Sequence, residues 1–282
     1  MSGKPTVIST FAGCGGSSLG YKWAGFEELL AIEWDQDAAG TLKLNFPNVP
    51  VWQRDIRGIT GKEILEFTGL KLGELDVLDG SPPCQGFSTQ GDRNINDSRN
   101  DLSYEFIRLV NELKPKVFVM ENVAGMVKGK MKGKFKRIMK ALKNTGYNVK
   151  CKRMNAMHYE VPQSRNRLIF IGVKDGEPKY PKPLRYLVYP KKIDYKLKKY
   201  SHKRYGDHII STKKPCPTLT RTDRMYWDYN NEIGMKSYLF IASFPEDYRW
   251  HGSYTDIMAE IGNAVMPKFM EYIAKTIKER VL

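Results

Sequence analysis

Short apolar runs alternate with segments of helical periodicity along the first two thirds of the chain. The apolar runs are residues 6–11, 29–34, 51–56, 75–78 and 116–120. Between the last two, Phe106, Ile107, Val110 and Leu113 recur on one helical face and predict a core-facing helix over 103–113. A further helix is expected over 135–142, and further strands over 149–154 and 168–173. Strands that alternate with helices in this way indicate an α/β fold with a parallel sheet.

A glycine-rich turn joins the first apolar run to a helix-like segment at 21–25. The turn reads Ala12-Gly13-Cys14-Gly15-Gly16. Glycines let the backbone turn sharply and approach a ligand closely, and the helix that follows offers free N–H groups. A Gly-x-Gly alone is weak evidence, because many tight turns contain one.

The next two apolar runs both end in carboxylates. Glu33 lies 20 residues after Gly13, the spacing expected of an acid that holds a ribose diol, and Asp55 ends the following run. Parallel strands end at one edge of a sheet, so these acids predict a nucleoside pocket there. Trp34 is placed to stack on a purine, although an aromatic at such a position is more often part of the core.

The apolar run at 75–78 leads through Pro82-Pro83 to Cys84. Two prolines fix two φ angles and remove two backbone donors, so the strand must end there and its exit is stiff. A rigidly presented thiol near N–H groups or cations is suited to act as a thiolate nucleophile. A lone free cysteine is more commonly a small core residue, but the prolines and nearby glycines argue against that here.

Several motifs resemble those of the cytosine carbon-5 DNA methyltransferases of the prokaryotic or viral modification type. The segment Ser-Pro-Pro-Cys-Gln-Gly-Phe-Ser at 81–88 is similar to their nucleophile loop, which implies that Cys84 adds to carbon 6 of cytosine. Glu121-Asn122-Val123 resembles the element whose glutamate hydrogen-bonds the ring nitrogen. In Gln163-Ser164-Arg165-Asn166-Arg167 we take Arg165 as the arginine set against the flipped base, and Arg167 as structural.

The resemblance also implies the methyl donor S-adenosyl-L-methionine as cofactor. The segment 261–265, Ile-Gly-Asn-Ala-Val, is a family signature and implies that the C-terminus returns beside the first strand to close the cofactor pocket. The implied cofactor contacts lie at strand ends and in this signature: Phe11, Ala12, Gly13, Cys14, Gly15, Gly16, Glu33, Trp34, Asp55, Ile56, Ser81, Pro83, Leu102, Asn263 and Ala264.

From residue 175 the composition changes to interleaved basic residues and tyrosines broken by prolines, as expected of a loop-rich nucleic-acid surface. Residues 215–221, Pro-Cys-Pro-Thr-Leu-Thr-Arg, resemble part of the family's target-recognition region. The implied architecture is a Rossmann-like methyltransferase fold with a mixed, mostly parallel sheet, residues 1–174 completed by 237–282, and a small loop-rich target-recognition domain at 175–236. The segment 234–238, Gly-Met-Lys-Ser-Tyr, departs from the family pattern and leaves the packing of that domain open.

The charge balance fits a nucleic-acid partner. The 282 residues include 46 Lys and Arg against 31 Asp and Glu, a formal net charge of +15, which favours a polyanion. A run of basic residues over 128–140 is either a solvated helix face or a phosphate contact. Neither a membrane span nor a signal peptide is evident, and four scattered cysteines and four histidines lack metal-ligand spacing. We therefore expect a cytoplasmic monomer that binds double-stranded DNA, with no metal and no membrane partner.

Two rival functions remain. The first is an RNA methyltransferase on the same fold, although the Cys-Phe-Thr element of that branch is absent near the recognition segment. The second is a catalytically silent nucleic-acid-binding or cofactor-sensing protein. The joint presence of Cys84, Glu121 and Arg165 disfavours it, because a decayed enzyme would have lost one of them.

Overall fold

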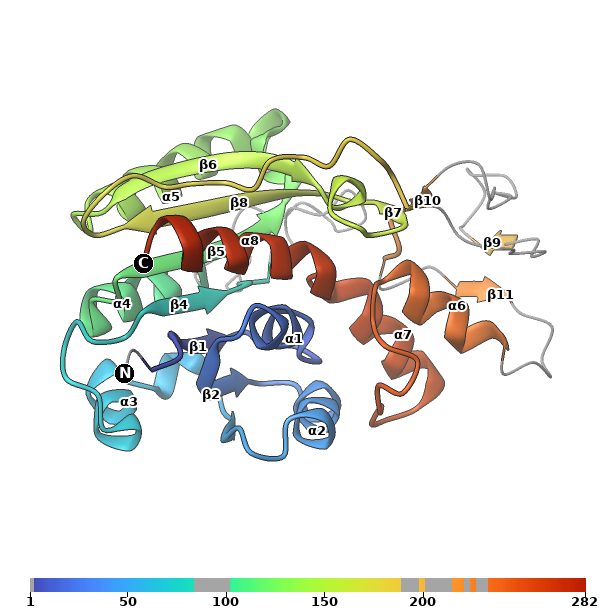
Figure 1. Cartoon of the computed structure of the whole chain (residues 1–282), viewed down its shortest axis with the longest axis horizontal. Helices are drawn as coiled ribbons and strands as arrows, with labels where there is room; N and C mark the ends of the chain where they lie inside the picture. Colours follow the sequence, from blue (N-terminus) through green and yellow to red (C-terminus); the bar gives the residue numbers. More distant parts are fainter. Residues whose placement is uncertain (1–2, 84–101, 189–197, 201–214, 221–223, 227–232) are drawn as a thin grey trace.

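A seven-stranded sheet forms the centre of the molecule (Figure 1). The computed structural model describes residues 3–83, 102–188, 198–200, 215–220, 224–226 and 233–282. The strands lie in the order β3 (Val51–Gln53), β2 (Glu27–Glu33), β1 (Thr6–Thr10), β4 (Val77–Gly80), β5 (Val117–Val123), β8 (Asn166–Val173) and β6 (Asn148–Asn155). The first five are parallel, and β8 runs antiparallel to both of its neighbours. This mixed, mostly parallel sheet confirms the predicted fold class.

Helices cover both faces of the sheet, which explains why its strands are apolar on both sides. Successive residues point to opposite faces, so Val7 and Val77 join one buried cluster while Ile8 and Leu78 join the other. The first cluster lies under α1 (Gly16–Trp23), α2 (Gln36–Asn45) and α8 (Pro267–Arg280). The second lies under α3 (Gly61–Thr68), α4 (Leu102–Leu113) and α5 (Lys132–Lys143).

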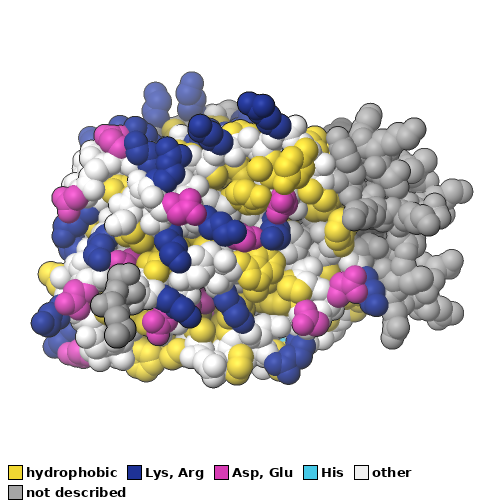
Figure 2. Space-filling model, viewed as in Figure 1, with side chains coloured by type: hydrophobic (Ala, Val, Ile, Leu, Met, Phe, Trp, Pro, Cys, Tyr) yellow, Lys and Arg dark blue, Asp and Glu magenta, His cyan; other side chains and the backbone are white. Residues whose placement is uncertain are grey.

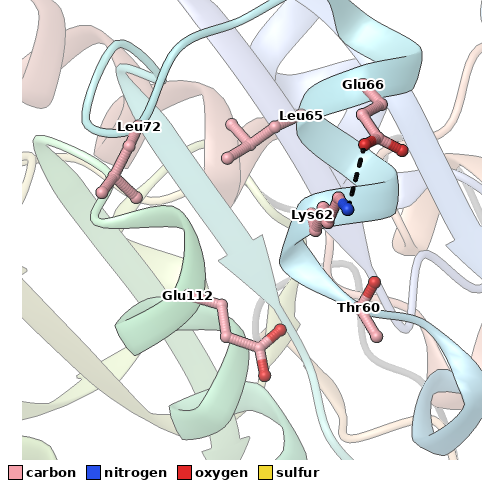
Figure 3. Close-up of a pocket in the computed structure, with 6 residues that line it drawn as sticks. All are labelled: Thr60, Lys62, Leu65, Glu66, Leu72 and Glu112. Carbon is pink, nitrogen blue, oxygen red and sulfur yellow. Dashed lines mark ion pairs between the residues drawn. The ribbon is translucent and has the colours of Figure 1, made fainter.

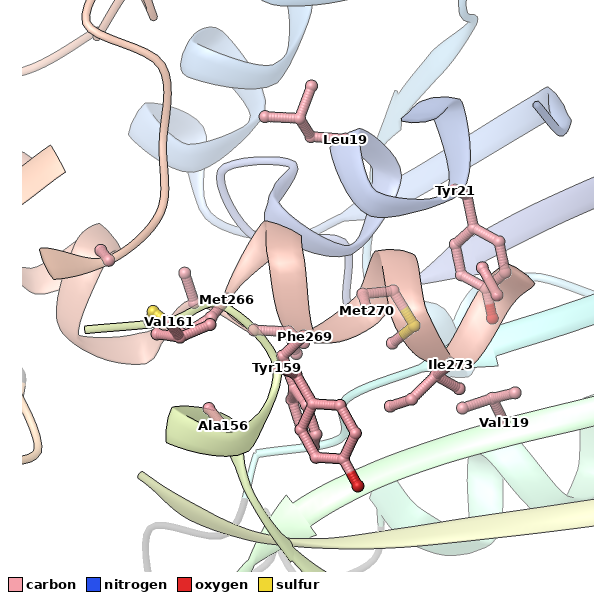
Figure 4. Packing of buried hydrophobic residues seen from close by; sticks show 14 of the residues in the cluster. Leu19, Tyr21, Val119, Ala156, Tyr159, Val161, Met266, Phe269, Met270 and Ile273 are labelled. Atoms are coloured by element: carbon pink, nitrogen blue, oxygen red, sulfur yellow. The ribbon is translucent and has the colours of Figure 1, made fainter. Parts of the chain in front are cut away.

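The C-terminal helix returns to the beginning of the chain. α8 lies against α1, and its Phe269, Met270 and Ile273 belong to the first buried cluster (Figure 4). A Cβ at Gly20 would stand 2.6 Å from the Cβ of Met270, so only glycine permits this close approach of the two helices. The return of the C-terminus beside the first strand is therefore as the signature at 261–265 implied.

Several element boundaries differ from the sequence prediction. α1 begins at Gly16, five residues before the expected start, because the glycine turn itself opens the helix. β3 ends at Gln53, and Asp55 caps a short 3₁₀ turn (Ile56–Gly58) in place of ending the strand. Glu121 lies within β5, where it is opposite Ile169 of β8. That antiparallel partner extends the strand beyond the apolar run that predicted it.

Part of the basic segment is joined to the main sheet region. β10 (Cys216–Pro217) pairs in parallel with β7 (Gln163–Ser164), and β9 (Lys198–Tyr200) pairs with β11 (Arg224–Tyr226). The rest of the C-terminal segment contains α6 (Ile233–Ile241) and α7 (Tyr254–Asn263). Within the ranges given above, no helix is long and apolar enough to cross a membrane.

Candidate active site

The turn after β1 has the strained backbone expected of a ligand-binding loop. Phe11 has a φ of 53°, a left-handed conformation that a bulky residue rarely adopts, and Gly15 has a φ of 87°. A Cβ at Gly16 would stand 2.2 Å from the carbonyl oxygen of Val265, so the turn fits closely against the C-terminal signature. Two segments that the sequence assigned to the cofactor, 11–16 and 263–264, are thus brought together.

Glu33 is held at the end of β2 by backbone donors. One carboxylate oxygen accepts a hydrogen bond from Gly13 N at 2.6 Å, and the other accepts from the N–H groups of Trp34 and Asp35, each at 2.8 Å. Burial raises the pKa of this carboxyl above its usual value, and the three N–H donors oppose that rise. A carboxylate has about four lone-pair positions, so one acceptor position remains on Oε2 for a ligand hydroxyl.

Trp34 is not a core residue. Its side chain is 69% exposed directly beside Glu33, at the carboxyl end of the parallel strands. A large exposed indole next to a carboxylate acceptor suits the base and ribose of an adenosine. The residues present therefore fit the nucleoside part of S-adenosylmethionine.

Asp55 is close in sequence to this edge but is already paired. Its carboxylate accepts from Arg57 N at 3.0 Å and from Arg57 Nη2 at 2.6 Å, which lowers the pKa of the carboxyl. The carbonyl of Ile56 accepts from Arg108 at 3.0 Å. The structure thus gives Asp55 and Ile56 partners within the protein that sequence patterning did not reveal.

A buried carboxylate lies where α7 meets the glycine turn. Glu260 is only 7% exposed, its backbone carbonyl lies 3.8 Å from Cys14 Sγ, and its side-chain oxygens make no hydrogen bond with the described residues. Burial raises its pKa to about 8, and the nearby Thr41 hydroxyl only partly offsets this. Asn263, the last residue of α7, is exposed, and Ala264 is buried beside it.

The end of β4 leads toward the proposed nucleophile. Ser81 and Pro83 follow the strand, and Asn122 Nδ2 of β5 donates to the carbonyl of Pro82 at 3.3 Å. Cys84 itself lies outside the described residues, and the description resumes at Leu102, the first residue of α4. β4 and β5 are parallel neighbours, so the loop that carries Cys84 leaves the sheet beside the strand of Glu121, as predicted.

Burial makes Cys14 and Cys151 poor nucleophiles. Burial raises the pKa of the Cys14 thiol well above its ordinary value and that of Cys151 to about 12. Cys216 is buried in β10. A thiol held protonated in an apolar interior does not attack, because the thiolate is the reactive form.

Glu121 pairs with Arg167 in the interior of the site. Glu121 Oε1 lies 2.6 Å from Arg167 Nε, and the two side chains are only 11% and 12% exposed. The antiparallel pairing of β5 with β8 brings the two residues onto neighbouring strands. The arginine next to the candidate acid is therefore Arg167, which the sequence had indicated as structural.

Arg165 serves instead as a buried cross-link. It is 1% exposed, and its guanidinium donates to the carbonyls of Leu219 at 2.7 Å, Gly262 at 2.8 Å and Ala264 at 3.0 Å. These carbonyls belong to the recognition-like segment and to the C-terminal signature. These contacts hold the Arg165 guanidinium inside the protein, although its Nε has no hydrogen-bond partner among the described residues. That Arg165 is set against the base stays a prediction.

Sequence reasoning also missed a buried carboxylate in β4. Asp79 accepts from Ser17 Oγ at 2.6 Å and from the hydroxyl of Tyr21 at 3.3 Å, and burial raises its pKa to about 7. It ties β4 to α1 beneath the cofactor turn. The only signal was a charged residue inside an apolar run, which could equally mark a strand end.

A shallow hollow elsewhere on the surface is separate from this site. It has a volume of about 420 Å³, lies between α3 and α4, and is lined by Thr60, Lys62, Leu65, Glu66, Leu72 and Glu112 (Figure 3). On the α3 side, Lys62 and Glu66 form an exposed ion pair at 3.7 Å one helical turn apart. None of these residues was predicted as functional. Among the residues that the structure describes, no group of three or more His, Cys, Asp or Glu could hold a metal ion.

Comparison with known proteins identifies relatives. A profile described as C-5 cytosine-specific DNA methylase matches residues 5–231. The type II methyltransferase M.XorII of Xanthomonas oryzae pv. oryzae is 41% identical over 184 residues, which cover 64% of this chain and 43% of the relative. The type II methyltransferase M1.HphI of Haemophilus parahaemolyticus is 30% identical over 96% of this chain and 86% of its own length. The chain thus spans less than half of the first relative but most of the second.

A solved structure shares the whole architecture. It is a crystal structure described as a DNA modification methyltransferase encoded within a prophage (E. coli), with a TM-score of 0.73 and 26% identity. The match covers 98% of this chain and 99% of that chain. The strand order and the C-terminal return are therefore parts of a shared fold.

Proposed function

The chain belongs to the C-5 cytosine-specific DNA methylase family, whose members use S-adenosylmethionine, and we propose that it methylates carbon 5 of cytosine in double-stranded DNA. The buried Glu121–Arg167 pair carries this proposal. Glu121 lies on β5, next to the strand that leads to Cys84, and Arg167 lies on β8 beyond it, at the sheet edge that also presents Glu33 and Trp34. One edge therefore combines groups suited to a nucleoside cofactor with groups suited to a pyrimidine.

S-adenosylmethionine supplies the methyl group. Glu33 would accept a hydrogen bond from its ribose, and Trp34 would stack on its adenine. The turn at 11–16 and residues 263–264 would hold the remainder, together with Ser81, Pro83 and Leu102. Asp55 joins this pocket only if its carboxylate exchanges part of the Arg57 pairing for the ligand.

The target base must leave the stacked duplex to reach these residues, at a cost of roughly a few kcal/mol. The Cys84 thiolate then adds to carbon 6, which makes carbon 5 nucleophilic. Arg167 contacts Oε1 of Glu121, so Oε2 is left to hydrogen-bond the ring nitrogen and favour its protonation. Carbon 5 would then take up the methyl group that a bound cofactor supplies. Loss of the carbon 5 proton then expels Cys84 and restores the ring.

Residues 175–236 read the target sequence in this proposal, and the protein acts as a monomer. Arg165 is assigned a positioning role, since it links Leu219 of that segment to the cofactor-side carbonyls of Gly262 and Ala264. The formal charge of +15 favours the phosphate contacts that DNA binding requires.

A covalent trap tests the mechanism. On DNA that contains 5-fluorocytosine, the last elimination cannot occur, so wild-type protein with S-adenosylmethionine should give a complex that survives denaturing electrophoresis. Cys84→Ser should give none and should still bind DNA. A stable adduct with Cys84→Ser would falsify the assignment of the nucleophile.

Absence of an adduct with the wild type, on fluorinated DNA of mixed sequence, favours RNA methylation or a silent protein. Incubation of genomic DNA with the protein and the cofactor, followed by bisulfite sequencing, identifies the methylated cytosines and hence the target site.

A further inference from the structure

The outer face of α5 carries a stripe of positive charge. Lys132, Lys136, Lys140 and Lys143 recur at intervals of four, four and three residues, which places them on one side of the helix, and all four are exposed. The opposite side, which includes Ile138 and Leu142, is buried in the core. Exposed Arg137 and Lys128 border the stripe, and we call these six residues the α5 stripe.

Nothing in the described part of the chain neutralises the α5 stripe. None of its six residues forms an ion pair with a described residue, whereas Arg54, Lys116 and Lys150 on other elements each pair with a carboxylate. The helix contains no acidic residue, and its first turn has neither an acid nor a side-chain cap. Like charges four residues apart each destabilise a helix by about 0.2–0.5 kcal/mol. The stripe therefore costs folding stability that no internal contact recovers.

The α5 stripe begins close to the candidate active site. α5 follows β5, the strand of Glu121, and the intervening turns hold Lys128, so the stripe starts near the edge of the site and runs back along the outside of the sheet (Figure 1). Dark blue side chains gather along the upper edge of the molecule, over β6 and α5 (Figure 2). On the exposed end of β6, Arg153 extends this basic region.

We propose that the α5 stripe binds the phosphate backbone of duplex DNA that flanks the target site, as a second contact surface distinct from residues 175–236. The identity of the partner as duplex DNA rests on the proposed function. A 12-residue helix is about 18 Å long, at about 1.5 Å per residue. This length spans roughly five base pairs, because a duplex carries about one charge per 1.7 Å of axis. The regular spacing of unpaired cations along one face suits a repeating anionic polymer.

A charge-matched comparison tests the proposal. The stripe variant changes Lys136, Arg137 and Lys140 together to Gln, and the control variant changes exposed Lys4, Lys62 and Lys71 to Gln. Both lose three positive charges. Affinity for a random-sequence duplex of about 40 base pairs is measured from low to physiological salt. The stripe variant should lower the slope of log affinity against log salt by about 2 to 3, because each lost phosphate contact removes about 0.9. The control should keep the wild-type slope.

The rate of DNA methylation provides the second measurement. On a short duplex centred on the mapped target, the stripe variant should methylate at the wild-type rate, whereas on long DNA its rate at limiting DNA concentration should fall about tenfold or more, which corresponds to about 1.4 kcal/mol. Its melting temperature should be no lower than that of the wild type, since repulsion along the helix is removed.

Equal salt slopes for the stripe and control variants overturn the proposal. So does a stripe variant that loses binding to anionic lipid vesicles but keeps duplex binding, since the stripe then serves a membrane surface. If the wild type methylates no DNA, the proposed function fails, and the slope comparison still decides whether the stripe binds a duplex.

Discussion

Two glutamates at the same edge of the sheet are held in opposite ways. Glu33, on the cofactor side, receives hydrogen bonds from three backbone N–H groups and forms no ion pair with a described residue. Glu121, two strands beyond β1, is paired with the buried guanidinium of Arg167. Backbone dipoles orient Glu33 as an acceptor for neutral hydroxyls. The ion pair with Arg167 fixes the position of the Glu121 carboxylate at this edge of the sheet.

The cofactor side, around Glu33, and the base side, around Glu121, also differ in the sequence separation between each residue and its partners. The partners of Glu33 are within about 20 residues, on one β–turn–α unit. Glu121 and Arg167 are brought together by an antiparallel pairing of β5 with β8, and Arg165 reaches carbonyls 54, 97 and 99 residues away. The cofactor side is thus built locally, whereas the base side depends on the complete fold. Mutations should separate the two.

The largest effect is expected at Glu121. Glu121→Gln keeps the size of the side chain but removes the charge that Arg167 pairs with and the capacity to assist protonation of the ring. General acid–base assistance contributes about 10²–10⁴-fold, so the single-turnover rate of methyl transfer should fall by that amount. Affinity for S-adenosylmethionine, measured by calorimetry, should stay at the wild-type value. A parallel Glu66→Gln change on exposed α3 is the control. Equal loss of rate and of cofactor affinity would show that the two sides are not separable.

Arg165 is expected to contribute to the free energy of unfolding, because it joins Leu219 to the carbonyls of Gly262 and Ala264. Arg165→Met leaves three buried carbonyls without their donor, and each such loss costs about 1–3 kcal/mol. We expect the free energy of unfolding, measured with urea, to fall by roughly 3 kcal/mol or more, given that the carbonyls can relax only partly. Exposed Arg185→Met is the matched control. An unfolding free energy within about 0.5 kcal/mol of the wild type would contradict the cross-link, since ordinary surface changes fall in that range.

The sequence could predict the cofactor side better than the base side, because the cofactor side is built from residues that are close together in the chain. The glycine turn, Glu33 and the parallel order of β4 and β5 followed from local patterns, and the structure confirms their arrangement. The different contacts of Arg165 and Arg167 did not follow, because both residues stand in one motif, two positions apart. Only the pairing of β8 with β5, and the contacts with Leu219 and Ala264, show that Arg167 reaches Glu121 whereas Arg165 binds backbone carbonyls. The expectation that Asp55 ends its strand was also wrong, because a residue that caps a turn and a residue that ends a strand look alike in sequence.

A smaller effect, limited to the affinity for the cofactor, is expected from a change at Glu33. Glu33→Ala removes the acceptor for the ribose and the bonds that hold the turn at Gly13. A hydrogen bond to a charged group is worth about 1.5–3 kcal/mol, so the affinity for S-adenosylmethionine should fall by about 10- to 100-fold in calorimetry. DNA affinity without cofactor should be unchanged. Glu27→Ala, at the exposed start of the same strand, should leave both affinities intact. Unchanged cofactor affinity in Glu33→Ala would place the nucleoside elsewhere.

The smallest effect is a pH dependence at Glu260. Burial raises the pKa of this carboxyl to about 8 in the folded protein, against about 4.3 in an unfolded chain. Between these values the folded state binds a proton that the unfolded state has released, so stability is greatest at low pH and declines as pH rises toward 8. Glu260→Gln mimics the protonated acid, so its stability should match that of the wild type below about pH 4 and diverge from it as the pH rises. Above pH 8 it should be more stable by on the order of 1–2 kcal/mol, less than the full shift because the site can relax.

Urea unfolding at several pH values between 5 and 8.5 measures this divergence, with exposed Glu279→Gln as the control. Burial raises the pKa values of Glu28 and Asp79 to about 7 as well, so the variant should still lose some stability over the same range. Parallel curves for wild type and Glu260→Gln would mean that Glu260 is ionised throughout. In that case a cation or water must reach the junction of α7 with the glycine turn, since an isolated charge in an apolar interior is too costly to persist.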